Sequence, residues 1–128
     1  MNMLLKLNLE SETPIYLQLR NSIIEGIASG QLKEGEALPS VRMMASDLGV
    51  NMHTVNKAYQ LLKQAGFILI HRQKGVVVNP DGMPGLDDEY KESLNSGLRP
   101  FISEAICRGM GESEFLKMCQ TIFKDIKQ

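Results

Sequence analysis

A chain of 128 residues has room for one compact domain and an accessory element, but not for two full domains. Apolar residues make up 43% of the chain, enough for a hydrophobic core, and the net charge of −1 by itself indicates no partner. No stretch approaches the roughly 20 apolar residues of a membrane span, and the first residues do not resemble a signal peptide. These features argue against a membrane partner and predict a soluble, cytoplasmic protein with reduced thiols.

The charge is unevenly distributed along the chain. Residues 39–80 carry five basic side chains and one acidic side chain, a net charge of +4, whereas residues 81–128 carry six basic and nine acidic side chains, a net charge of −3. A basic middle next to an acidic tail favours a polyanionic partner for the middle alone. Ordinary variation in surface charge explains the same numbers equally well.

The first 39 residues predict an arm, a helix and a loop. Apolar and polar residues alternate over residues 1–12, which are therefore either an edge strand or a disordered lead-in. A helix is expected over about 14–29, with Thr13 as N-cap and Pro14 as its opening residue. Residues 30–39 are expected to form a loop. The inner face of the helix is expected to contain Tyr16, Leu19, Ile23 and Ile27.

Two shorter helices separated by a tight turn are expected next. The first follows the N-cap Ser40 and ends at Gly49, and the second follows the N-cap Asn51 and ends at Gly66. Apolar residues at helical spacing define the inner faces. These are Val41, Met44, Ala45 and Leu48 in the first helix, and Val55, Ala58, Tyr59 and Leu62 in the second.

A β-hairpin and a linker complete the first part of the chain. Residues 67–70 and 76–78 are β-prone and enclose a polar, basic tip over residues 71–75. Proline and glycine are frequent over residues 80–86, which is typical of a linker. The predicted domains are therefore 1–80 and 81–128.

The C-terminal part predicts two helices that need a partner. Apolar residues recur every four positions over residues 87–107, although Pro100 is expected to kink or split this helix. A last helix is expected over 113–126. Two short helices bury little apolar area alone, so we expect them to pair with the same segment of a second chain. The expected dimer contacts are Leu94, Leu98, Ile102, Ile106, Phe115, Cys119, Ile122 and Phe123.

Together these elements predict a mostly α-helical fold with a small β-hairpin: a winged helix-turn-helix domain followed by a two-helix dimerisation segment. The second motif helix fits the major groove of DNA, the preceding helix directs its N-terminus at a phosphate, and a basic hairpin reaches the neighbouring backbone. The expected DNA contacts are Ser40, Arg42, Asn51, Met52, His53, Thr54, Asn56, Lys57, Arg72, Gln73, Lys74 and Gly75.

Several short motifs follow one another along the first part of the chain in a characteristic order and spacing. They are Pro14-Ile15-Tyr16-Leu17-Gln18, Pro39-Ser40-Val41-Arg42, Leu48-Gly49-Val50-Asn51, Thr54-Val55, Lys57-Ala58-Tyr59, Gly66-Phe67-Ile68 and Lys74-Gly75. In these motifs the chain strongly resembles the DNA-binding domain of GntR-family bacterial regulators over roughly residues 10–79, and its short tail is similar to the YtrA-type subgroup.

The resemblance implies a sequence-specific, dimeric repressor that binds a palindromic operator in double-stranded DNA. For the YtrA-type subgroup it further implies control of a transporter operon that includes the regulator's own gene. The chain departs from the family pattern at three positions. Met52 and Asn56 stand where many members have arginine. Gln73 stands where the wing, the hairpin tip from Arg72 to Gly75, often has glycine. A known operator therefore cannot be transferred to this chain.

Other interpretations are weaker. His53 and His71 have no second ligand at metal spacing, so no metal and no cofactor are expected. The residues show no nucleophile–base pair or phosphate loop, so no enzyme is expected. The two cysteines are expected to be buried, and the Met43-Met44 pair is expected to lie in the core. The open alternatives are a protein-binding winged helix without DNA specificity and a small-molecule pocket lined by Tyr90, Phe101 and Phe115, although no effector is indicated.

Overall fold

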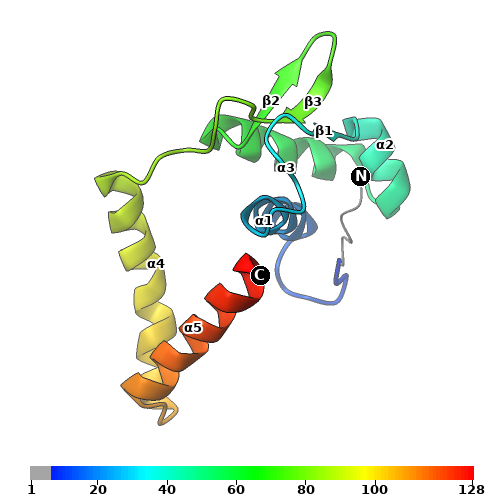
Figure 1. The fold of residues 1–128 in the computed structure, drawn as a ribbon. Helices are drawn as coiled ribbons and strands as arrows, with labels where there is room; N and C mark the ends of the chain where they lie inside the picture. The colour runs from blue at the N-terminus through cyan, green and yellow to red at the C-terminus, as the bar shows by residue number, and fades with distance from the viewer. Residues whose placement is uncertain (1–6) are drawn as a thin grey trace. The chain divides into compact units, whose positions relative to one another are not determined.

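The computed structural model describes residues 7–128, so residues 1–6 of the predicted arm lie outside the described residues. The described part of the arm, residues 7–12, contains turns and no strand. The chain divides into two compact units, one ending at Pro84 and the other running from Gly85 to Gln128 (Figure 1). The elements are α1 (Ile15–Ala28), β1 (Ala37–Leu38), α2 (Val41–Leu48), α3 (Met52–Ala65), β2 (Ile68–His71), β3 (Gly75–Val78), α4 (Asp88–Cys107) and α5 (Glu112–Lys127).

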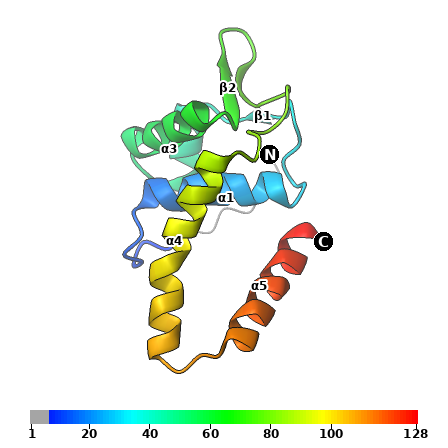
Figure 2. The same cartoon turned by 90° about the vertical axis from the view of Figure 1, so that its left-hand side faces the viewer.

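In the first unit, three helices pack beside a small antiparallel sheet. Helix α3 contacts α1, α2 and β2, and the strand order is β1-β3-β2. The β2–β3 hairpin projects away from the helices in both views (Figures 1 and 2). The prediction that residues 30–39 form only a loop was wrong in one respect, because Ala37 and Leu38 pair with Val77 and Val76 of β3.

The core of this unit is aliphatic and centres on α3. The predicted inner face of α3 is confirmed, since Val55, Ala58, Tyr59 and Leu62 are completely buried. Burying an aliphatic side chain such as Val55 or Leu62 stabilises the fold by roughly 1.5–3 kcal/mol. Helix α1, the loop after it, α2 and the sheet supply the remaining buried apolar residues. They are Leu19, Ile23, Leu32, Leu38, Met44, Ala45, Ile68, Val76, Val77 and Val78.

In the first unit, the helix ends follow the capping chemistry of the sequence with one exception. Ser40 Oγ accepts the N–H of Met43 at 3.1 Å, and Asn51 Oδ1 accepts the N–H of His53 at 2.7 Å, as predicted. Gly49 ends α2 with φ 69°, a left-handed conformation that allows the sharp turn into α3. The prediction for α1 was wrong, because Pro14 rather than Thr13 occupies the N-cap position and no side chain caps the helix.

The start of α1 is instead fastened to the preceding segment by the Gln18 side chain. Its Oε1 accepts the N–H of Asn8 at 2.7 Å, and its Nε2 donates to the carbonyl oxygens of Asn8 and Thr13 at 2.9 and 2.8 Å. A single amide thus satisfies three backbone groups of a turn that belongs to no helix or strand. This explains why glutamine is useful at this position of the α1 sequence.

The second unit consists of α4 and α5, joined by a short turn at Gly109, which has φ 91° (Figure 2). The two helices are confirmed, and Pro100 does not split α4. Neither helix contains a buried residue. No helix within residues 7–128 is long and apolar enough to cross a membrane.

Candidate nucleic-acid interface

The exposed side of α3 presents the side chains that the sequence predicted as base readers. Met52, His53 and Asn56 are exposed in its first two turns, and 46% of Met52 is accessible. Thr54 is half-buried because it lies closer to the core-facing side. The opposite, completely buried side of α3 holds the helix in place, so these side chains extend from a rigid support.

Tyr59 links α3 to the start of α2. Its hydroxyl donates a hydrogen bond of 2.8 Å to the carbonyl oxygen of Pro39, the residue before the N-cap Ser40. Burial raises the pKa of this hydroxyl far above its ordinary value. The sequence predicted Tyr59 only as a core residue. Its second role was missed because the partner lies 20 positions earlier in the chain.

The N-terminus of α2 exposes Ser40 and Arg42. Ser40 Oγ is the acceptor in the helix cap, which leaves its O–H available as a donor. The only ion pair within residues 7–128 joins Arg108 to Glu104, so Arg42 has no acidic partner there. A helix N-terminus with an unpaired guanidinium beside it is suited to binding a phosphate.

The β2–β3 hairpin places the four predicted wing residues at its tip. His71 pairs with Gly75, and Arg72, Gln73, Lys74 and Gly75 are all exposed. Asn79 fastens the base of the hairpin to the end of α3, because its Nδ2 donates to the carbonyl oxygen of Gly66 at 2.9 Å and its N–H donates to that of Phe67 at 3.0 Å. The wing is therefore attached directly to the helix that carries the predicted base readers.

Besides the capping Ser40, two further predicted DNA-contacting residues have partners within the protein. The Lys57 ammonium lies 4.0 Å from the centre of the Tyr16 ring, a cation–π contact between α3 and α1. The Asn51 amide oxygen caps α3. The sequence pattern missed the contact of Lys57, because it joins residues 41 positions apart that only the tertiary fold brings together.

The prediction that Met43 lies in the core together with Met44 was wrong. Only Met44 belongs to the core, where it is 1% accessible, whereas 57% of Met43 is accessible. The two residues are neighbours in α2, and successive side chains on a helix point about 100° apart. The burial of one therefore directs the other to solvent.

The predicted dimer contacts lie on exposed faces of α4 and α5. Leu98, Ile102, Ile106, Phe115 and Cys119 line one hollow of about 530 Å³ between the two helices. The remaining three, Leu94, Ile122 and Phe123, are exposed on the same two helices, and 69% of Phe123 is accessible. The expectation that both cysteines are buried was wrong, because Cys107 is exposed and Cys119 is partly exposed.

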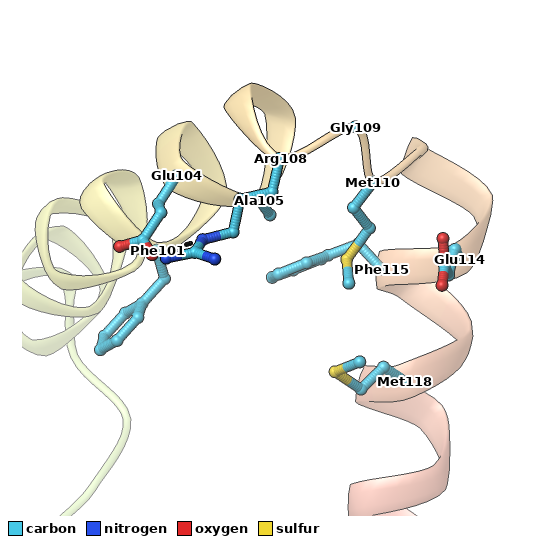
Figure 3. A pocket seen from close by; sticks show the side chains of 9 residues that line it. All are labelled: Phe101, Glu104, Ala105, Arg108, Gly109, Met110, Glu114, Phe115 and Met118. Atoms are coloured by element: carbon cyan, nitrogen blue, oxygen red, sulfur yellow. Dashed lines mark hydrogen bonds and ion pairs between the residues drawn. The ribbon is translucent and has the colours of Figure 1, made fainter.

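A second hollow of about 560 Å³ lies between the same two helices (Figure 3). Phe115 and Met118 extend from α5 toward α4, and Phe101 lies on the α4 side. Glu104 and Arg108 form an exposed ion pair on its wall at 2.7 Å. Phe101 and Phe115 thus share this hollow, whereas Tyr90 does not line it. Within residues 7–128, no three His, Cys, Asp or Glu side chains are arranged so that they could hold a metal ion.

The comparisons with known proteins agree with this geometry. The family model described as bacterial regulatory proteins, gntR family, matches residues 15–78, which spans α1 to the end of β3. The chain belongs to the GntR family. It is therefore a DNA-binding transcriptional regulator with a winged helix-turn-helix fold, as the sequence predicted.

Relatives of this GntR regulator are themselves regulators rather than enzymes. The HTH-type transcriptional repressor YtrA of Bacillus subtilis is 28% identical, over 97% of this chain and 95% of the relative. A structure described as a transcriptional antiterminator from Listeria monocytogenes is 30% identical, covers 100% of this chain and 96% of its own, and has a TM-score of 0.91. YtrA from Sulfolobus acidocaldarius, a GntR-family transcription factor, is 44% identical over 80% of this chain and 97% of its own, with a TM-score of 0.60.

Proposed function

We propose that this GntR regulator is a homodimeric repressor that binds a palindromic operator in the cytoplasm, with α3 in the major groove and the wing on the adjacent backbone. The observation that carries the proposal is the exposed face of α3, where Met52, His53 and Asn56 extend from a helix whose other side is completely buried. An exposed, rigidly supported helix of this kind has the geometry required to read base edges.

Positive charge supports the same orientation. Arg42 at the start of α2, and Arg72 and Lys74 on the wing, are exposed and have no acidic partner within residues 7–128. Contacts from such side chains to phosphates position a protein on the duplex, while contacts to base edges select the sequence. The two groups therefore have separate roles in the proposed complex.

Exposed apolar side chains support dimerisation through the second unit. Helices α4 and α5 have no buried residue, although both carry large apolar side chains at helical spacing. A monomer would leave this surface in water, and a contiguous apolar surface of this kind is typical of a protein interface. Pairing two copies through the same face gives the two-fold symmetry that a palindromic operator requires.

The proposed target is a transporter operon that includes the regulator's own gene. This follows from the resemblance to the YtrA-type subgroup and from the described function of the Bacillus subtilis relative as a transcriptional repressor. The chain matches that relative over nearly the whole length of both proteins, including the short second unit.

Selection of bound sequences from a random DNA duplex pool tests the proposal, at roughly physiological salt to suppress non-specific binding. We expect an inverted repeat whose half-sites are about one helical turn apart or more. The repeat should occur upstream of the regulator's gene, and reporter expression from that promoter should rise when the gene is deleted. Folded, dimeric protein that selects no sequence would instead favour a protein-binding module.

A further inference from the structure

We infer that the start of α3 reads A·T pairs, with Asn56 bonding to an adenine and Met52 contacting a thymine methyl group. The inference rests on the proposed DNA-binding function and specifies the bases that it recognises. It follows from which side chains of α3 remain available for DNA and which are already engaged within the protein.

Helix α3 has no side chain placed to read guanine. The commonest specific contact to guanine is a bidentate bond from arginine or lysine to its O6 and N7 atoms. Helix α3 contains no arginine and two lysines, Lys57 and Lys63. Lys57 is held over the Tyr16 ring at 4.0 Å, and Lys63 lies in the last turn, 11 residues after Met52 and roughly 16 Å further along the axis. Neither lysine is therefore placed to read guanine beside the first turns of α3.

Asn56 provides the positive part of the inference. Its side chain is exposed, and within residues 7–128 its amide forms no hydrogen bond, unlike the amide of Asn51, which caps the helix. An asparagine amide offers one acceptor and one donor side by side, which match the N6 amino group and N7 of adenine. Guanine presents two acceptors at these positions, so the amide oxygen would face O6 without a hydrogen bond.

Met52 lies one turn earlier on the same face of α3, because residues four positions apart are neighbours on a helix. Its thioether side chain is 46% accessible and has no strong hydrogen-bonding group. Beside thymine it buries the C5 methyl group, whereas beside cytosine it would leave the N4 amino group without an acceptor. His53 does not alter this preference, since a single ring N–H pairs with the N7 atom that both purines share.

The test compares sequence selection by the wild-type chain of residues 1–128 and by the variants Asn56→Ala and Met52→Ala. The wild type should prefer adenine at the operator position that faces Asn56 and thymine at the position that faces Met52. Asn56→Ala should lose the first preference in each half-site, and Met52→Ala should lose the second. The variant Lys57→Met keeps the apolar stem against Tyr16 and removes the charge. It should retain the wild-type sequence preference, whatever its overall affinity.

Modified bases provide a readout that misfolding cannot imitate. 7-Deazaadenine lacks the N7 acceptor. Placing it at the operator position that faces Asn56 should reduce the affinity of the wild type about fivefold or more, and should not reduce the affinity of Asn56→Ala. Replacing thymine by uracil at the Met52 position removes only the methyl group and should weaken binding by the wild type but not by Met52→Ala.

The inference is overturned if the wild type prefers a G·C pair at either position, if Lys57→Met changes the preferred base, or if neither modified base weakens binding. Each of these outcomes leaves the proposed regulator intact, because the wild type still selects an operator. Failure of the wild type to bind any DNA sequence would overturn the proposed function as well.

Discussion

Tyr59 shows how a single side chain stabilises the core and also positions α2 relative to α3. Its ring is completely buried in α3, and its hydroxyl donates to the Pro39 carbonyl at the entrance to α2. A phenylalanine at this position would keep the packing and leave the partly buried carbonyl oxygen of Pro39 without this partner. The hydroxyl therefore fixes the α2 N-terminus, with Ser40 and Arg42, relative to α3.

For Tyr59→Phe we expect a loss of about 1 kcal/mol in the free energy of unfolding, because one partly buried hydrogen bond disappears. Chemical denaturation followed by circular dichroism measures the change. The control is Tyr90→Phe, which removes a hydroxyl from a side chain that is 54% accessible and should change stability by less than about 0.5 kcal/mol. Equal effects of the two substitutions would contradict the assigned role of the Pro39 bond.

The raised pKa of Tyr59 adds a pH signature to the same comparison. Above its ordinary value of 10.0 the hydroxyl ionises in the unfolded chain but stays protonated in the folded one. Stability should therefore fall with rising pH above about 10, by up to about 1.4 kcal/mol per pH unit from this group. The fall should be shallower in Tyr59→Phe, and identical alkaline profiles would argue against a buried, protonated hydroxyl.

At the scale of elements, the sequence predicted what local chemistry determines. Ser40 and Asn51 were identifiable as N-caps, Gly49 and Gly66 as helix ends, and the buried side of α3 from its helical spacing. Strand β1 was missed because its two residues are too few for an alternating pattern, and it becomes a strand only by pairing with β3. The contact between Lys57 and Tyr16 was missed for the related reason that sequence spacing carries no information about packing between helices.

The wing is the element whose charge can be tested most directly. The double variant Arg72→Ala/Lys74→Ala should bind every DNA sequence more weakly, because both side chains are proposed to neutralise phosphates. The slope of log affinity against log salt concentration should become shallower by about 0.9 for each lost contact. A fluorescence anisotropy titration at several salt concentrations measures it. The control variant Lys124→Ala/Lys127→Ala removes the same charge from the last turn of α5, outside the proposed DNA interface. It should leave the slope unchanged.

At the scale of the whole molecule, the two units differ in how they are stabilised. The unit ending at Pro84 has a continuous core, whereas residues 85–128 have none of their own. The spacing of apolar residues in α4 and α5 could be predicted from the sequence. The two hollows between the helices could not, because they depend on how far α4 and α5 diverge from the turn at Gly109.

The variant Ile102→Glu tests the proposed dimer, because it places a charge in the middle of the apolar stripe of α4. Burying that charge without a partner is unfavourable, so we expect the dimer dissociation constant to rise at least about tenfold. Sedimentation equilibrium measures this directly, and affinity for the full inverted repeat should fall with it. Ser96→Glu adds the same charge about 200° around the helix from Leu94 and should remain dimeric. A dimeric Ile102→Glu protein would place the interface elsewhere.

Because α4 and α5 contain no buried side chain, operator occupancy should depend steeply on the concentration of the protein. If a second copy completes this unit, its order is governed by mass action, and dilution below the dissociation constant exposes the apolar stripes again. Operator occupancy then varies with the square of the monomer concentration when monomers predominate. For a regulator that represses its own gene, operator occupancy would therefore fall more steeply than the protein concentration. Dilution by cell growth and division alone would then relieve repression.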